Sequence, residues 1–224
     1  MARLARRDTK DRLVAAATAL FAERGFHGTT VRDIAERAGA NVAAGNYHYG
    51  SKKELYLQVL RTHFQAMRAL LTRRRASVPQ SELSGLSPSE LDELLETRIR
   101  TMLEVLLGPP PGLHGTLMVR EFVDPSEALP DIVDEFIRPM KAEMEQIVAH
   151  RMPELDTRDV ERCVMSIVGQ VLFFRFAMPV ALEIIGRKKY PREFCRETAE
   201  HIAAFSLGGM RELVKPKMRK RRAG

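Results

Sequence analysis

The residues with the most informative chemistry in this chain stand between Asn41 and Lys52, where small, amide and aromatic side chains precede a lysine. The segment reads Asn41-Val42-Ala43-Ala44-Gly45-Asn46-Tyr47-His48-Tyr49-Gly50-Ser51-Lys52. Ala44 and Gly45 allow close approach of the backbone and can lie against a thymine methyl group, and the amide of Asn46 can donate and accept hydrogen bonds together, as an adenine edge requires. A thin, polar helix without acidic residues fits the major groove, so the segment predicts contact with DNA.

Two short helices joined by a tight turn must position these residues. The first, from Thr29 or Thr30 to Ala38, has Asp33 three residues after Thr30, which is close to the capping-box pattern. Gly39 follows where the chain turns sharply, a position that favours a residue free to adopt positive φ. This arrangement is a helix-turn-helix, which makes double-stranded DNA the first partner to consider.

Three polar groups near helix starts are suited to phosphate. Lys52 begins the next helix, where its ammonium adds to the positive end of the helix dipole. Asn41 can cap the recognition helix and meet a phosphate at once, and Thr30 offers a hydroxyl beside a helix N-terminus. A solvated surface lysine remains the alternative for Lys52.

The rest of the chain predicts helices and no strands. An amphipathic helix covers residues 10–24, and a helix from Ser51 to about Arg75 begins with the pattern Ser51-x-x-Glu54. After a linker at 77–90, where Ser87 or Ser89 can cap the next helix, helices are expected at about 91–106, 113–123, 126–151 with a break at Pro139, 157–185 with a bend at Pro179, and 191–214. The expected fold class is all-α.

Charge is distributed unevenly along the 224 residues. Residues 1–78 carry a net charge of +9, residues 79–214 carry −8 and residues 215–224 carry +6, for a total of +7. A basic N-terminal region followed by an acidic region is typical of a nucleic-acid-binding protein that carries a second domain with another role. We expect a DNA-binding domain at 1–56, a helical effector-binding and dimerisation domain at 57–214, and a basic disordered tail at 215–224.

Several function classes lack their signatures in this sequence. The six histidines are scattered, and neither a zinc-protease motif nor a phosphate-binding loop occurs, so we expect no enzyme activity and no cofactor. Cys163 and Cys195 lack metal-type spacing, which predicts no metal site and a reducing compartment. The absence of a signal peptide and of a membrane span predicts a cytoplasmic protein without a membrane partner.

The chain resembles the TetR family of bacterial transcriptional regulators. The resemblance covers about 50 residues through Leu20-Phe21-Ala22-Glu23-Arg24-Gly25-Phe26, Thr29-Thr30-Val31-Arg32-Asp33-Ile34-Ala35, Ala38-Gly39 and Tyr47-His48-Tyr49-Gly50-Ser51-Lys52. Within the family it is similar to the CecR-like subgroup, which Arg120-Glu121-Phe122-x-x-Pro125 and Gly169-Gln170-x-Leu172-Phe173-Phe174-Arg175-Phe176 also support. Many family members have Tyr where this chain has Asn46, so base readout cannot be copied from them.

The resemblance implies a homodimer that binds a palindromic operator and releases it when a small-molecule effector enters the C-terminal domain. It also implies that Tyr47 and His48 approach the sugar-phosphate backbone and that Arg32 reaches a guanine, with an exposed salt bridge as the alternative for Arg32. The residues expected to contact DNA are therefore Thr30, Arg32, Asn41, Ala44, Gly45, Asn46, Tyr47, His48 and Lys52.

The body offers two further sets of residues, for which simple core packing is the alternative. Adaptable or polar side chains in apolar surroundings predict an effector pocket from Met102, Met118, Phe122, Gln170, Phe173, Phe174 and Arg175. Arg175 needs a carboxylate partner if buried, and Glu121 or Glu183 can serve. A four-helix dimer interface, implied by the resemblance, is expected from Val164, Ile167, Val171, Ile202, Phe205 and Met210.

These observations together favour a repressor that a small hydrophobic or amphipathic ligand releases from DNA. A ligand-responsive activator and a helical interaction protein that does not read DNA remain as alternatives.

Overall fold

A computed structural model describes residues 2–41, 49–108 and 113–222. Throughout these ranges the regular elements are helices, and no strand occurs, which confirms the all-α prediction. The chain forms two compact units, Met1–Met67 with Pro109–Ile137, and Arg68–Gly108 with Arg138–Gly224. The division differs from the expected boundary at residue 57, because a segment from the middle of the chain packs with the N-terminal helices.

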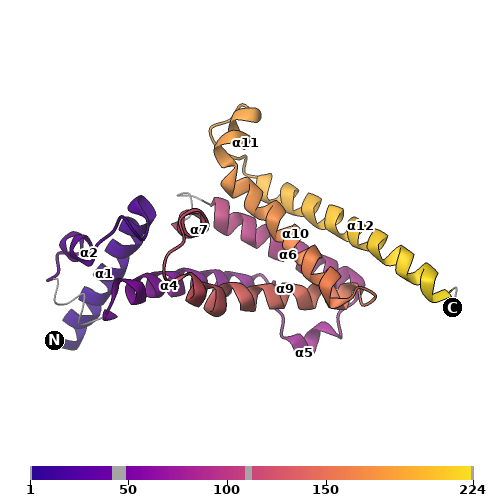
Figure 1. The fold of residues 1–224 in the computed structure, drawn as a ribbon, viewed down its shortest axis with the longest axis horizontal. Helices are drawn as coiled ribbons and strands as arrows, with labels where there is room; N and C mark the ends of the chain where they lie inside the picture. The colour runs from indigo at the N-terminus through magenta and orange to yellow at the C-terminus, as the bar shows by residue number, and fades with distance from the viewer. Residues whose placement is uncertain (1, 42–48, 109–112, 223–224) are drawn as a thin grey trace. The chain divides into compact units, whose positions relative to one another are not determined.

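The first unit contains the N-terminal helices and this later segment (Figure 1). Its elements are α1 (Ala2–Arg24), α2 (Val31–Arg37), the first part of α4 (Lys52–Arg73), α7 (Leu113–Val123), α8 (Leu129–Ile132) and the π-helix η1 (Val133–Ile137). Thr30 caps α2 and forms the complete capping box with Asp33, as the sequence predicted. Ser51 accepts a hydrogen bond from the backbone N of Glu54 at 3.1 Å, so the predicted cap of α4 also forms.

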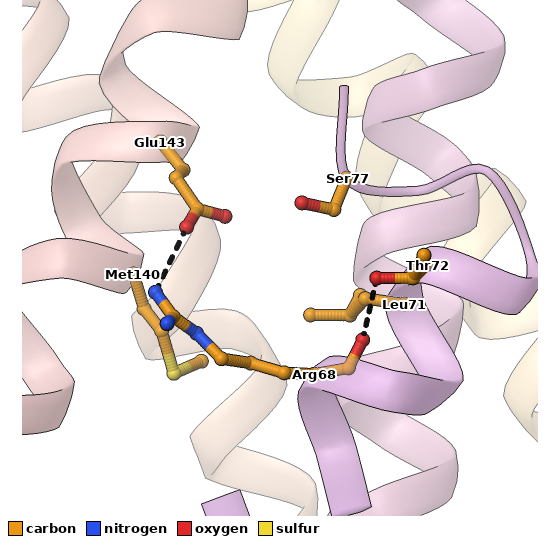
Figure 2. Close-up of a pocket in the computed structure, with 6 residues that line it drawn as sticks. All are labelled: Arg68, Leu71, Thr72, Ser77, Met140 and Glu143. Atoms are coloured by element: carbon orange, nitrogen blue, oxygen red, sulfur yellow. Dashed lines mark hydrogen bonds and ion pairs between the residues drawn. The ribbon is translucent and has the colours of Figure 1, made fainter. Parts of the chain in front are cut away.

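The second unit is a bundle of longer helices (Figure 1). It consists of the end of α4, α5 (Gln80–Leu83), α6 (Pro88–Leu107), α9 (Arg138–Arg151), α10 (Thr157–Phe176), α11 (Met178–Ile184) and α12 (Phe194–Arg222). Ion pairs join several of these helices near their surfaces. Arg68 on α4 contacts Glu143 on α9 at 3.3 Å (Figure 2), and Arg151 on α9 binds both oxygens of Asp92 on α6.

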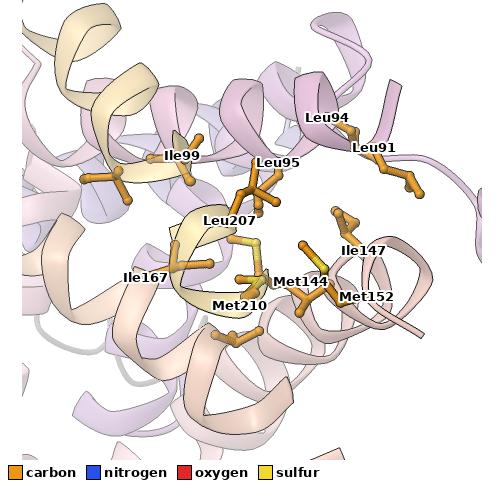
Figure 3. Close-up of a cluster of buried hydrophobic side chains, with 14 of the residues drawn as sticks. Leu91, Leu94, Leu95, Ile99, Met144, Ile147, Met152, Ile167, Leu207 and Met210 are labelled. Carbon is orange, nitrogen blue, oxygen red and sulfur yellow. The ribbon is translucent and has the colours of Figure 1, made fainter. Parts of the chain in front are cut away.

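The core of the second unit is one apolar cluster contributed by α6, α9, α10 and α12 (Figure 3). Its best-buried members include Leu95, Ile99, Val148 and Ile167, all at most 1% exposed. Each helix contributes residues at spacings of three and four, so one stripe of each helix faces the cluster. Burial of these side chains holds the bundle together.

The structure refines four expectations about helix boundaries. The linker contains the short helix α5, and a π-helical segment separates α8 from α9 just before Pro139. The predicted bend at Pro179 is confirmed as a 74° angle between α10 and α11. The expected disordered tail is wrong for most of its length, because α12 continues to Arg222. Lys and Arg have good helix propensity, so a run of positive charge does not by itself end a helix.

The structure also selects the cap of α6. Ser87 accepts a hydrogen bond from the backbone N of Glu90 at 3.3 Å and returns one from its own N to the Glu90 carboxylate at 2.7 Å. We expect Ser87→Ala to lower the free energy of unfolding by about 1 kcal/mol. The matched variant Ser89→Ala is expected to change it by less than about 0.5 kcal/mol. Urea unfolding measures both values, and equal losses would contradict the assigned cap.

Candidate nucleic-acid interface and effector sites

Four of the nine predicted DNA contacts lie among the described residues. Thr30, Arg32 and Asn41 are exposed, whereas Lys52 is half-buried. Ala44, Gly45, Asn46, Tyr47 and His48 lie outside the described residues. The hydroxyl of Thr30 donates to Asp33 at 2.6 Å, and this bond together with the backbone bond from Thr30 lowers the pKa of the Asp33 carboxyl. Thr30 is therefore fixed at the start of α2, where a helix N-terminus favours an anion.

Lys52 has a structural role that sequence reasoning missed. Its ammonium donates to the carbonyl oxygen of Phe26 at 3.1 Å and lies 4.1 Å from the centre of the Phe26 ring. A cation over an aromatic face is attracted by the ring quadrupole. The two contacts hold the ammonium at the first residue of α4. They use one of its three N–H donors and leave a positively charged group at the helix start.

An aromatic cluster joins α1 to α4 beneath this surface. The ring of Tyr56 lies 4.8 Å from that of Phe21 and 5.2 Å from that of Phe26, measured between centroids. Tyr56 is 2% exposed, and burial raises the pKa of its hydroxyl. This hydroxyl donates to the carboxylate of Glu121 at 3.0 Å.

Tyr49 is half-buried. Its hydroxyl donates to the carbonyl oxygen of Lys10 at 3.3 Å, and burial raises its pKa to about 12. The side chain therefore anchors the beginning of α4 to α1.

The motif from Arg120 to Pro125 attaches α7 to the first unit. Arg120 donates to the carbonyl oxygens of Ala22 and Glu23, at 2.8 and 2.6 Å, and so satisfies acceptors at the C-terminus of α1. Glu121 is 3% exposed and accepts hydrogen bonds from the N and Oγ of Ser126, at 3.0 and 2.9 Å, in addition to Tyr56.

Glu121 was one of two carboxylates considered from the sequence as a partner of Arg175. Its carboxylate accepts hydrogen bonds from Tyr56 and Ser126, so it anchors α7, and a pairing with Arg175 stays a prediction. Arg175 lies in the other unit and is half-buried, and burial lowers the pKa of its guanidinium.

Comparison with known proteins identifies the architecture around these contacts. The profile described as "Bacterial regulatory proteins, tetR family" matches residues 13–59. The profile described as "HTH-type transcriptional dual regulator CecR, C-terminal domain" matches residues 91–210, which is more than half of the chain. The chain belongs to the TetR family of bacterial transcriptional regulators.

Individual relatives of this TetR-family regulator agree with both profiles. The transcriptional dual regulator CecR of Shigella flexneri is 26% identical over 197 residues, which are 82% of this chain and 83% of that protein. IcaR of Staphylococcus aureus strain Newman, a negative regulator of the biofilm operon icaADBC, is 36% identical over 62 residues, or 28% of this chain and 33% of that protein.

A solved structure shows the same fold along most of the chain. The transcriptional regulator FadR of Bacillus subtilis, solved in complex with stearoyl-CoA, superposes with a TM-score of 0.63 and 15% sequence identity. The match covers 88% of this chain and 97% of that one. The N-terminal helix-turn-helix domain and the helical body predicted from the sequence are thus confirmed.

The predicted effector-pocket residues are distributed over both units. Met118 and Phe122 belong to the first unit, where Met118 is buried and Phe122 is half exposed. Met102, Gln170, Phe173, Phe174 and Arg175 belong to the second unit. Gln170 donates to Ser206 Oγ on α12 at 3.4 Å, and Phe173 is 57% exposed. None of the seven lines either of the two cavities described below, and the predicted effector pocket stays a prediction.

Two cavities do occur among the described residues. The first unit has one of about 730 Å³ between α1 and α4, lined by Lys10, Asp11, Val14, Ala15, Thr18, Gln58, Thr62 and His63. The second unit has one of about 280 Å³, lined by residues of α4, α9 and the chain that follows α4. Hydrophobic periodicity does not predict either cavity, since each is lined by mixed polar and apolar residues from separate segments.

The predicted dimer-interface residues need a correction. Val164, Ile167, Val171, Ile202 and Met210 are at most 2% exposed within the single chain, so they are core residues of the second unit. Among the six, Phe205 alone is accessible, at 67% exposed. The apolar periodicity of these helices marks the face that packs inside the protomer.

The described residues contain no cluster of His, Cys, Asp or Glu suited to a metal ion. In the same ranges no single helix has the length and hydropathy of a bilayer span, although α10 and α11 meet the criterion as a bent pair.

His63 on the wall of the larger cavity predicts a pH dependence. Burial lowers the pKa of its imidazole from 6.5, so the unfolded chain binds the proton at a higher pH than the folded protein. The free energy of unfolding should therefore fall as the pH drops below about 6.5. Between pH 7.5 and 5.5, urea unfolding should show a smaller loss for His63→Gln than for the wild type. The exposed His201 provides a control variant, and equal pH dependence in wild type and His63→Gln would refute the assignment.

Proposed function

We propose that this regulator is a homodimeric repressor that binds a palindromic operator and leaves it when a small-molecule effector binds its second unit. The observation that carries the proposal is the helix-turn-helix match at residues 13–59 joined to a CecR-type C-terminal domain. The negative role of IcaR and the ligand in the FadR structure support repression and effector binding.

Operator recognition is assigned to α2 and the segment that follows it. Thr30 and Arg32 stand at the exposed start of α2, and Asn41 is exposed beyond its end. Asn46 is the proposed adenine contact, with Ala44 and Gly45 allowing close approach. Tyr47, His48 and Lys52 are the proposed backbone contacts, where positive or hydroxyl-bearing groups position the protein on the duplex.

Dimerisation is assigned to exposed apolar stripes on α10 and α12. Met165, Phe173 and Phe176 on α10 are 56%, 57% and 39% exposed, and Phe205 and Leu213 on α12 are 67% and 46% exposed. Apolar residues this exposed, in register along a helix, are typical of a surface that a partner covers.

Glycines in these stripes favour a helical partner. A Cβ added to Gly169, Gly208 or Gly209 would meet nothing within 4 Å in the chain's own fold, so their small size is not required within the protomer. A helix of a second chain that packs closely against these glycines would explain why they have no side chain. Two recognition helices in a dimer can then meet successive major grooves, about 34–36 Å apart.

Effector release requires that the ligand bind the non-operator conformation more tightly than the operator-bound one. The helix α4 is the structural connection for this coupling. It is continuous from Lys52 to Arg73, and it begins in the first unit and ends in the second.

The proposed dimer face predicts the effect of a charge. Phe205→Glu should shift the protein from dimer to monomer in sedimentation velocity while helicity by circular dichroism is unchanged, because an unpaired carboxylate in an apolar interface is costly. Val123→Glu, at a residue 73% exposed in the first unit, is the matched control and should stay dimeric. A dimeric Phe205→Glu variant would rule out this face.

The proposed DNA face predicts different effects for two exposed arginines. Arg32→Gln should weaken binding to a palindrome from the gene's own upstream region by about tenfold, and a phosphate contact would also lower the slope of log affinity against log salt by about 1. Arg37→Gln is the control, because Arg37 forms two hydrogen bonds with Glu23, at 2.7 and 2.8 Å. Gel shift over a salt series measures both variants. No sequence-selective shift by the wild type would refute the proposed function.

A further inference from the structure

The smaller cavity has the composition of an anion-binding site. It lies in the second unit and is lined by Arg68, Leu71, Thr72, Ser77, Met140 and Glu143 (Figure 2). Figure 2 shows Arg68 reaching from α4 toward Glu143 on the opposite helix, with Met140 beside its side chain and Ser77 across the space. The volume of about 280 Å³ equals that of about nine liquid water molecules, so it limits the ligand to a small molecule.

One carboxylate on this wall faces two guanidinium groups. Glu143 Oε2 accepts from Nη2 of Arg98 on α6 at 2.6 Å, and Glu143 Oε1 accepts from Nη2 of Arg68 at 3.3 Å. The three charges leave an excess of one positive charge at the cavity. An anion that enters therefore meets a net attraction.

The two arginines are held very differently. Arg98 is 2% exposed, and its Nη1 also donates a hydrogen bond to the carbonyl oxygen of Ala76 at 3.1 Å. A buried guanidinium needs a carboxylate partner, so Arg98 depends on Glu143. The side chain of Arg68 is 60% exposed, and its bond to Glu143 is the longer of the two. Arg68 is thus the group that can change partner without leaving a buried charge unpaired.

We propose that this cavity binds a small monocarboxylate with a short apolar body, which takes the Arg68 guanidinium from Glu143. A guanidinium fits a carboxylate through two parallel hydrogen bonds, a better geometry than the single long bond it now makes. Half-buried Met140 and the small exposed part of Leu71, which is 2% exposed, supply apolar contact for the short body of the ligand. Inorganic phosphate has no apolar part for these two side chains, so a carboxylate suits the site better. The inference rests on the proposed function only where it names this carboxylate as the effector.

Calorimetric titration of the full chain tests the site directly. The probes are benzoate and hexanoate, with benzamide as the uncharged analogue of benzoate and inorganic phosphate as the anion without an apolar part. We expect saturable binding of at least one carboxylate. Benzamide and phosphate should each bind at least tenfold more weakly. If neither carboxylate shows saturable binding at concentrations up to about 10 mM, where even very weak affinity is detected, the proposal is overturned. Equal affinity for benzoate and benzamide would also overturn it.

Two variants on α4 locate the binding. Arg68→Gln should weaken the carboxylate at least tenfold. Arg73→Gln, at an exposed arginine of the same helix outside the lining, should leave its affinity within twofold. Both variants should show the helicity and melting temperature of the wild type. Equal affinity in the two variants would overturn the assignment to Arg68.

Operator gel shifts with the same probe separate the site from its role. A carboxylate that binds through Arg68 and weakens operator affinity at least tenfold identifies the effector site. Binding through Arg68 with unchanged operator affinity keeps the carboxylate site and refutes its role as effector site. A protein that binds carboxylate but no DNA refutes the proposed function and leaves the site standing.

Discussion

The buried carboxylate of Glu121 is the constraint on which the first unit depends. A carboxylate that is 3% exposed must be hydrogen-bonded, and its partners are the Tyr56 hydroxyl and the N and Oγ of Ser126. The same short segment places Arg120 on the last carbonyl oxygens of α1. Consequently α1, α4 and α7 are held together by hydrogen bonds. The helices of the helix-turn-helix unit therefore pack against a segment from the middle of the chain.

The packing of this middle segment makes the boundary between the two structural units differ from the boundary between the two family profiles. The CecR-type profile begins at residue 91, yet Pro109–Ile137, within its span, packs with the N-terminal helices. The sequence motif Arg120-Glu121-x-x-x-Pro125 therefore serves the DNA-binding unit, although it belongs to the domain that the profile counts as C-terminal. His27, whose Nε2 lies 3.2 Å from the carbonyl oxygen of Pro125, adds a further contact of this kind.

The sequence predicted local structure well and the use of surfaces poorly. Caps at Thr30 and Ser51, and the bend at Pro179, follow from interactions within a few residues, so they are visible in the sequence. Whether an apolar face of a helix packs in the core or against a partner depends on helices that are distant in the sequence. Val164 and Ile167 repeat with the same period as Met165, Gly169 and Phe173, and only the placement of neighbouring helices buries the first pair. The walls of the smaller cavity were not predicted for the same reason, since Arg68, Ser77 and Glu143 come from three separate segments.

Two arginines on one face of α4 hold this helix, one in each unit. Arg61 and Arg68 are seven residues apart, which is close to two turns, so they share one face of the helix. Arg61 binds both oxygens of Glu135, at 2.9 and 2.6 Å, and Arg68 contacts Glu143. The first pair joins α4 to η1 in the first unit. The second pair joins α4 to α9 in the second unit. The same face of α4 is thus held by an arginine–glutamate pair in each unit, and an exchange of partner at Arg68, as proposed above, removes the pair in the second unit only.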